Sequence, residues 1–326
     1  MAKNKAFPRR NFLLGTAAAI LGYAGFRAYQ HRPVSTAEIA TFKGVEKIVS
    51  QNGEVPEVIV LLQSHPNQDV NITGKDESSS SIDAVSGICN KLYQRGVRSL
   101  LIEGLDNHAR EVYNKSGKLK FKKGTTQASY HYFGELEKLL NRNKWELHNA
   151  ESPEIDSKVD EVRKQLQNKH EVILAETDNS IKYLFSPYRR KTISVSESNM
   201  LRGQYKRTID IANDKIRNAT TNFFTPERFN YLYDLEVTQR DVLFGQASKK
   251  AKEDKKTPII MIYGIAHQFS IPKNLQGMSY ALVRPSGIDR EPMPSSRESY
   301  IERHNFNLKE EDWNLILARK QITASK

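Results

Sequence analysis

The sequence predicts an α/β fold with a mainly parallel sheet flanked by helices. The continuous aliphatic run 58–62 is of the kind that forms a strand buried on both faces. A second apolar run at 97–102 follows a segment of helical length, an order typical of a right-handed βαβ unit with parallel pairing. A similar run recurs late in the chain, at 259–263. We therefore expect buried parallel strands that come from distant parts of the chain.

The helix between the first two strands is predicted from its apolar spacing. Its apolar residues recur every three or four positions, at Ile82, Val85, Cys89 and Leu92, and Gly96 is a residue type that commonly follows a helix. The same patterns predict three further elements, namely a helix over 132–140 and a third and a fifth strand over 145–150 and 279–283. The run 259–263 is the expected fourth strand.

The stretch 155–256, between the third and fourth strands, is predicted to be a mostly helical insertion. Its last helix has a clear start, with Thr225 as N-cap and then Pro226 and Glu227 in the first turn. A short amphipathic helix is expected near the C-terminus, over 308–320. The predicted organisation is an N-terminal segment 1–37, an α/β domain 38–290 that contains the insertion, and a C-terminal tail 291–326.

We expect the N-terminal segment to direct export. Arg9 and Arg10 precede an apolar stretch, 12–26, that is shorter than the ~20 residues needed to span a bilayer. This pattern is typical of a signal for the twin-arginine translocation machinery, which carries folded proteins across the inner membrane. The chain is then expected to be periplasmic, or anchored to the outer face of the inner membrane through this segment alone. The stretch 35–37 (Ser-Thr-Ala) is a fair cleavage site, so removal and retention of the segment both stay open.

Charge and cysteine content argue against two classes of function. The net charge is +12, but six of the 50 basic residues and none of the 38 acidic residues lie in 1–32, so the remainder carries +6. The remaining basic residues alternate with acids and lack the interleaved aromatic residues of a nucleic-acid groove, so we expect no nucleic-acid partner. The single cysteine, Cys89, excludes an internal disulfide and a cysteine-based zinc site. Its apolar helical position predicts burial.

Four polar residues follow four of the predicted strands at their C-terminal ends: His65, Glu103, Glu151 and His267. In open parallel sheets, ligands bind outside this edge. Two imidazoles and two carboxylates there are suited to a divalent metal with an open position, or to a metal-free acid–base pair in which a carboxylate orients an imidazole. Asp106 and His108 are possible substitutes or supporting groups. We expect the other histidines to be structural or solvated, namely His131, His148, His170 and His304.

Three short motifs accompany these residues. Gln239-Arg240-Asp241 precedes the fourth strand, which ends in Gly264-Ile265-Ala266-His267, and the second strand ends in Glu103-Gly104. Their order resembles that of the superfamily joining the TraB and Tiki proteins, the haem-binding lipoprotein ChaN and the erythromycin esterase-like proteins. The first Gly-x-x-His element of that superfamily reads Leu62-Gln63-Ser64-His65 here, with the histidine but without the glycine.

The resemblance implies a functional site at His65, Glu103 and His267. It implies a hydrolase of ester or peptide bonds acting on a small molecule or a peptide. In such a hydrolase, the convergence of polar residues at the strand ends would make Glu103 or Glu151 the general base. These two histidines and Glu103 would bind manganese or zinc where the enzyme is metal-dependent. Arg240 would clamp an anionic substrate group or brace a carboxylate, or else form a surface ion pair with its neighbour Asp241. The alternatives are a non-catalytic protein that binds haem or a metal, and a degenerate member whose site only stabilises the fold.

Overall fold

A computed structural model describes residues 32–64, 77–105, 107–121, 127–288 and 296–324. Two compact units make up the chain. The first unit consists of Met1–Glu151 and Arg240–Met293, and the second consists of Ser152–Gln239 and Pro294–Lys326. Residues 1–31 of the predicted export segment 1–37 lie outside the described residues. The same is true of His65. Among the described residues, no helix combines the length and the apolar character needed to cross a membrane.

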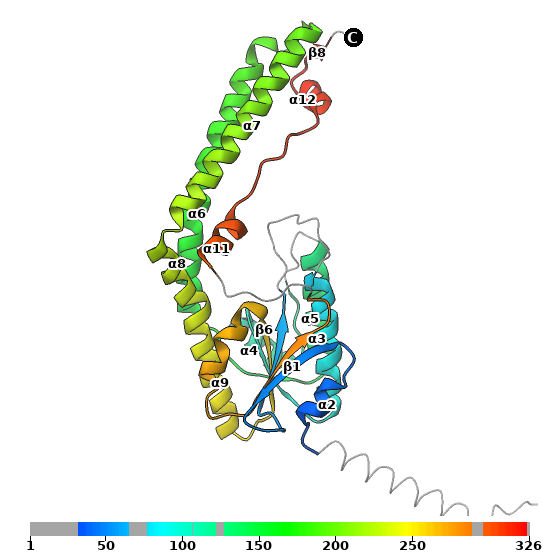
Figure 1. The fold of residues 1–326 in the computed structure, drawn as a ribbon. Coiled ribbons are helices and arrows are strands. Elements are labelled where there is room, and N and C mark those ends of the chain that lie inside the picture. The colour runs from blue at the N-terminus through cyan, green and yellow to red at the C-terminus, as the bar shows by residue number, and fades with distance from the viewer. Residues whose placement is uncertain (1–31, 65–76, 106, 122–126, 289–295, 325–326) are drawn as a thin grey trace, which may run out of the picture. The chain divides into compact units, whose positions relative to one another are not determined.

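A six-stranded sheet forms the centre of the first unit (Figure 1), in the order β1-β7-β2-β6-β3-β4. Its strands are β1 Val45–Gln51, β2 Val58–Gln63, β3 Ser99–Ile102, β4 Glu146–Leu147, β6 Ile259–Gly264 and β7 Tyr280–Pro285. All neighbours are parallel except β1, which is antiparallel to β7. The predicted α/β class with a mainly parallel sheet is confirmed.

Three details of the predicted sheet need correction. The strands β2 and β3 are parallel but do not pair, because the fully buried β6 lies between them. The third strand is shorter than predicted, since β4 is an edge strand that pairs only with the four-residue β3. The antiparallel edge strand β1 was not expected, because its mixed sequence VEKIVSQ leaves most of its residues exposed.

The central strands β2, β6 and β3 are buried on both faces. Ile59 and Leu61 of β2 pack into one core together with residues of α3 (Glu77–Gln94) and α5 (Gln127–Arg142). Val60 and Leu62 face the opposite core, which includes α9 (Arg240–Glu253) and the residues of α10 (Ile271–Asn274). This alternation follows from the two-residue period of a strand. Short helices α2 (Thr36–Ala40) and α4 (Asn107–Ser116) complete the unit, together with η3 (Ile265–Phe269).

The predicted helix between the first two strands is confirmed as α3. Gly96 follows it with a φ of +91°, a left-handed conformation that glycine adopts without steric cost. Cys89 of this helix is fully buried, as expected.

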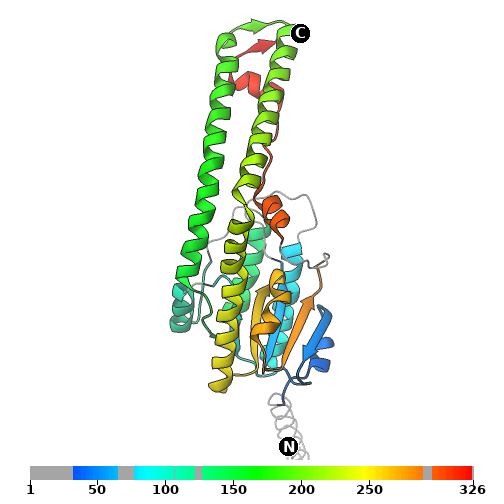
Figure 2. The same cartoon turned by 60° about the vertical axis from the view of Figure 1, so that its left-hand side comes forward.

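The second unit is built on a pair of long helices, α6 (Pro153–Phe185) and α7 (Val195–Phe223), which pack side by side (Figure 2). Other elements of this unit are η1 (Ser186–Tyr188), α8 (Pro226–Tyr233), the π-helical η2 (Asp234–Gln239), α11 (Arg297–His304), α12 (Trp313–Arg319) and a small parallel pair of β5 (Thr192–Ile193) with β8 (Thr323–Ala324). The hydroxyl of Thr225 accepts a hydrogen bond from the Arg228 amide, so the predicted N-cap is confirmed.

The C-terminal helix is shorter than the predicted 308–320. It starts at Trp313 because the Asp312 carboxylate caps it by accepting hydrogen bonds from the next turn. Leu308 is held outside the helix by the side chain of Asn213, which accepts from its amide at 2.7 Å and donates to its carbonyl at 3.2 Å.

Candidate active site

A buried carboxylate holds the histidine that follows β6. His267 lies in η3, and its Nδ1 is 2.8 Å from Oδ1 of Asp241 on α9. The hydroxyl of Tyr263 donates to the same oxygen at 2.7 Å. The Tyr263 ring also stacks on the imidazole, with 4.1 Å between the ring centroids. Hydrogen bonding at its edge and stacking on its face therefore orient the imidazole.

The other side of the imidazole faces Glu103. Its Nε2 lies 3.3 Å from Oε1 of Glu103, and the second carboxylate oxygen accepts a hydrogen bond from the Gly264 amide at 2.6 Å. These groups meet because β3 and β6 are parallel neighbours, with Ile102 beside Ile262, so that their C-terminal ends share one edge. The side chains of His267 and Glu103 are 5% and 10% exposed.

The surroundings of His267 favour its charged form. Burial alone lowers the pKa of this imidazole, but the charge of Glu103 and the hydrogen bonds to Asp241 and Glu103 outweigh it and raise the pKa to about 9. His267 is therefore an imidazolium at neutral pH, with an N–H directed at each carboxylate. Burial, together with the charges of Asp241 and Glu103, raises the pKa of Tyr263 well above its usual range, so its phenol stays a neutral donor.

Arg240 lies between two carboxylates. Its Nη1 is 3.6 Å from Oε1 of Glu103, and its Nε is 3.9 Å from Oε2 of Glu151. Glu151 is held by the Gly104 amide, which donates to it at 2.6 Å, and Gly104 has a left-handed φ of +78° that favours glycine. The predicted alternative of a surface ion pair between Arg240 and Asp241 is wrong, because Asp241 is completely buried and bonds to His267.

Four of the five predicted site residues therefore lie in one cluster: Glu103, Glu151, Arg240 and His267. The fifth, His65, lies outside the described residues, as does Asp106. His108 is exposed at the start of α4. Three of the remaining histidines have other partners, since His131 pairs with Asp83, His170 contacts Thr220, and His304 stacks on Phe224.

Judged from the described residues, the cluster suits acid–base chemistry better than metal binding. The Arg240 guanidinium already compensates the two carboxylates that a divalent cation would need. In the described part of the chain, one group of three side chains of metal-ligating type has its ligand atoms within 4.8 Å of one another. This group lies on α3 and α5 and consists of Asp83, His131 and Glu135. A metal held by His65, Glu103 and His267 stays a prediction.

Sequence reasoning did not place two members in the cluster, Asp241 and Tyr263. A signal for Asp241 is present on α9, where the buried residues Asp241, Phe244, Ser248 and Ala251 recur every three or four positions. This spacing places Asp241 on the buried face of the helix, where a carboxylate needs a partner. Tyr263 carries no such signal, because an aromatic residue in an apolar strand is usually only part of the core.

In chemical terms, the cluster combines a proton donor, the His267 imidazolium, with the proton-accepting carboxylate of Glu103 at one edge of the sheet. Comparison with known proteins adds no further information: no protein-family model, curated protein or solved structure matches the chain.

Proposed function

We propose that this chain is an exported hydrolase that breaks an ester or peptide bond with the pair Glu103 and His267. One observation carries the proposal: the chain of contacts from the buried Asp241 through both nitrogens of His267 to the oxygen of Glu103. A carboxylate behind an imidazole, with the far nitrogen directed at a second acid, is an arrangement suited to proton transfer. The resemblance to hydrolases described above supports the same class.

In this proposal, the Glu103 carboxylate takes a proton from a water molecule as the water attacks the carbonyl carbon. The imidazolium of His267 gives its Nε2 proton to the leaving oxygen or nitrogen as the carbonyl–heteroatom bond breaks. The proton on Glu103 then returns to Nε2 across the 3.3 Å gap and restores the starting state. Glu103 is assigned as the base in preference to Glu151 because Glu103 lies against Nε2, whereas Glu151 is only 4% exposed. Arg240 positions both carboxylates.

The metal-dependent form of this hydrolase is the variant in which His65 joins Glu103 and His267 around manganese or zinc. The Nδ1 of His267 already has the carboxylate partner that usually orients a metal-binding histidine. The haem alternative has less support, because both ring nitrogens of His267 face carboxylates.

The test is an assay of the purified chain on a panel of esters and peptides, with chelator, with manganese and with zinc. We expect His267→Gln and Glu103→Gln each to lower turnover by roughly 10²-fold or more. His131→Gln is the matched control, since His131 also contacts an aspartate but lies outside the cluster. Turnover that persists undiminished in both site variants would rule out the proposal. Binding of haem with a Soret band lost in His267→Gln would replace it by the alternative.

Export is tested separately. We expect replacement of Arg9 and Arg10 by lysine to keep the chain in the cytoplasm, because the translocation machinery reads the arginine pair. Cell fractionation measures the result, and Lys3→Arg together with Lys5→Arg is the control. Unchanged recovery from the periplasmic or membrane fraction would contradict the proposed signal.

A further inference from the structure

The described fold begins within the predicted export segment. The fair cleavage site at 35–37 would be cut between Ala37 and Glu38. In the structure, this bond lies inside the helix α2. Residues on both sides of it belong to the core of the first unit, since Val34 is 2% exposed and Ile39 is 0% exposed. Cleavage at this bond would therefore remove part of the folded unit.

Hydrogen bonds hold the backbone around the same bond. Ser35 caps α2, because its hydroxyl accepts from the Glu38 amide at 3.1 Å and its carbonyl accepts from the Ile39 amide at 3.0 Å. The amide and the hydroxyl of Thr36 both donate to the Glu54 carbonyl, at 2.7 Å and 3.0 Å. A protease cleaves backbone that is extended and free of such contacts, so cleavage here requires local unfolding of α2.

A buried arginine clamps the helix to the body of the unit. Arg95, which directly follows α3, donates from Nε and Nη2 to the two carboxylate oxygens of Glu38, at 2.6 Å and 3.1 Å. Its Nη2 also donates to the Arg32 carbonyl at 3.3 Å. The Arg95 side chain is 5% exposed, and a two-point contact of this kind is the strong form of a salt bridge. Because Arg32 precedes the candidate cleavage site and Glu38 follows it, the clamp holds both sides.

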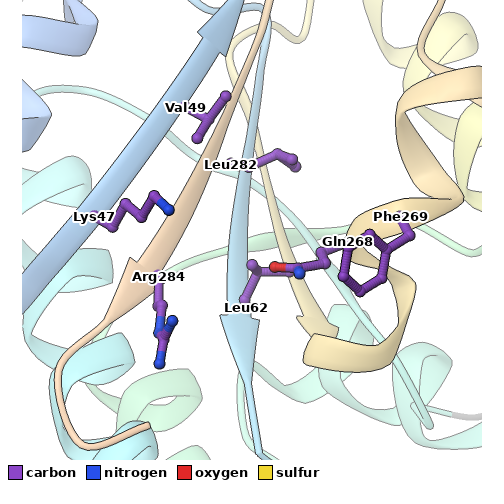
Figure 3. A pocket seen from close by; sticks show the side chains of 7 residues that line it. All are labelled: Lys47, Val49, Leu62, Gln268, Phe269, Leu282 and Arg284. Atoms are coloured by element: carbon purple, nitrogen blue, oxygen red, sulfur yellow. The ribbon is translucent and has the colours of Figure 1, made fainter. Parts of the chain in front are cut away.

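The chain beyond α2 is also fixed, because it enters the sheet. It continues into β1, which pairs with β7 over residues 45–51. In the pocket of Figure 3, Val49 of β1 lies beside its register partner Leu282 of β7, on one face of the sheet. Ile39 of α2 packs into the core on the other face. The residues on either side of the candidate site are thus integral to the first unit.

We propose that the export segment is not removed and that it keeps the exported chain attached to the outer face of the inner membrane. The twin-arginine machinery carries folded proteins, so the bond after Ala37 reaches the far side of the membrane already inside α2. The apolar stretch 12–26 then remains as the anchor. It is shorter than a relaxed span, but the bilayer thins around short spans and flanking arginine side chains reach its surface.

The two steps of this proposal have different support. Protection of the bond after Ala37 follows from the contacts of α2 alone. Attachment to the membrane also rests on the proposed export.

Protection is tested by incubating the purified full chain, in detergent, with a bacterial signal peptidase. Gln30→Ala places small residues at positions 28 and 30, ahead of the first described residue, Arg32. We expect this variant to be cut after position 30 at least ~10-fold faster than the unsubstituted chain is cut after Ala37. Gln30→Asn is the matched control and should stay intact. Cleavage after Ala37 at the rate of the Gln30→Ala variant, or failure to cleave that variant, would overturn protection by folding.

The clamp is tested in the same assay. We expect Arg95→Ala to raise the rate of cleavage after Ala37 by about 10-fold, because loss of the buried ion pair makes opening of α2 more frequent. Arg95→Lys keeps the charge without the two-point contact and should give an intermediate rate. Lys91→Ala removes an exposed charge of α3 outside the clamp and is the matched control. Equal rates for Arg95→Ala and Lys91→Ala would contradict the role of the clamp.

Attachment is tested in cells by fractionation, alkaline carbonate extraction and intact mass measurement. We expect the unsubstituted chain in the membrane fraction with its export segment intact, open to protease added to spheroplasts, and the Gln30→Ala variant soluble in the periplasm. A soluble periplasmic chain that begins at Glu38 would overturn the proposal, and a soluble chain with its segment intact would refute the anchor alone. Retention in the cytoplasm would refute the proposed export, whereas the peptidase assay would still decide whether α2 protects the bond.

Discussion

Two histidine–aspartate pairs of the first unit have almost the same nitrogen-to-oxygen distance and very different surroundings. His267 lies 2.8 Å from Asp241, and His131 lies 2.9 Å from Asp83. The side chains of the first pair are 5% and 0% exposed, whereas those of the second are 40% and 57% exposed. Water screens the exposed pair and offers its groups other partners, so such pairs contribute little. Water cannot replace the partners of the buried pair, so we expect the contact between His267 and Asp241 to matter for both stability and proton transfer.

The largest expected effect comes from removing the buried carboxylate. Asp241→Ala leaves His267 without its Nδ1 partner and the Tyr263 hydroxyl without its acceptor, so we expect a loss of about 3–5 kcal/mol in the free energy of unfolding. Asp241→Asn keeps an acceptor oxygen at this position and should lose less. Denaturant titration of the full chain measures both. A loss in Asp241→Ala no larger than in Asp83→Ala would remove the distinction between the two pairs.

The second effect is on pH dependence. The pKa of His267 is raised to about 9, so the folded chain binds this proton more tightly than the unfolded chain does. This contribution to stability is complete below pH 6.5, the usual pKa, and is lost as the pH rises through 9. Its size is at most ~3 kcal/mol. Unfolding at a series of pH values between 6 and 10 measures it, and His267→Gln should flatten the curve in this range. Equal slopes for both chains would contradict the assigned charge.

A third effect concerns the link between His267 and Glu103. Among the influences that raise the pKa of His267, the charge of Glu103 is the largest. Glu103→Gln should therefore lower that pKa by ~1 unit or more, while the Asp241 contact remains. An NMR titration of the imidazole signals measures the shift. Lys138→Gln is a suitable control because it changes an exposed charge near the other pair. A pKa that stays near 9 in Glu103→Gln would show that Asp241 alone holds the proton.

The smallest effect is expected at the exposed pair. Asp83→Ala and His131→Ala should each change the free energy of unfolding by less than about 1 kcal/mol, because both groups are solvated before and after the change. A double-mutant cycle with denaturant titration measures their coupling. A coupling of several kcal/mol would mean that solvent exposure does not separate the two pairs.

The parts of the site that depend on local sequence could be predicted, whereas the contacts that depend on packing could not. The strand-end rule located Glu103, Glu151 and His267 together, because parallel strands bring their C-terminal ends to one edge whatever their order. The strand order itself was not predictable, and β6 lies between β2 and β3 without a local signal for it. Asp241 was expected at most to form a surface ion pair with Arg240, because its real partner, His267, is set by how α9 packs on the sheet.

Period and composition were enough for the α/β class and for the buried strands β2 and β6. They were also enough for the helix start at Thr225 and for the helix end at Gly96, since each depends on residues close in sequence. The edge strand β1 exists only through its pairing with β7, because its own residues are too polar to predict it. The same holds for the charge on His267. A histidine has no fixed protonation state until folding removes water from it and places Asp241 and Glu103 against its two nitrogens.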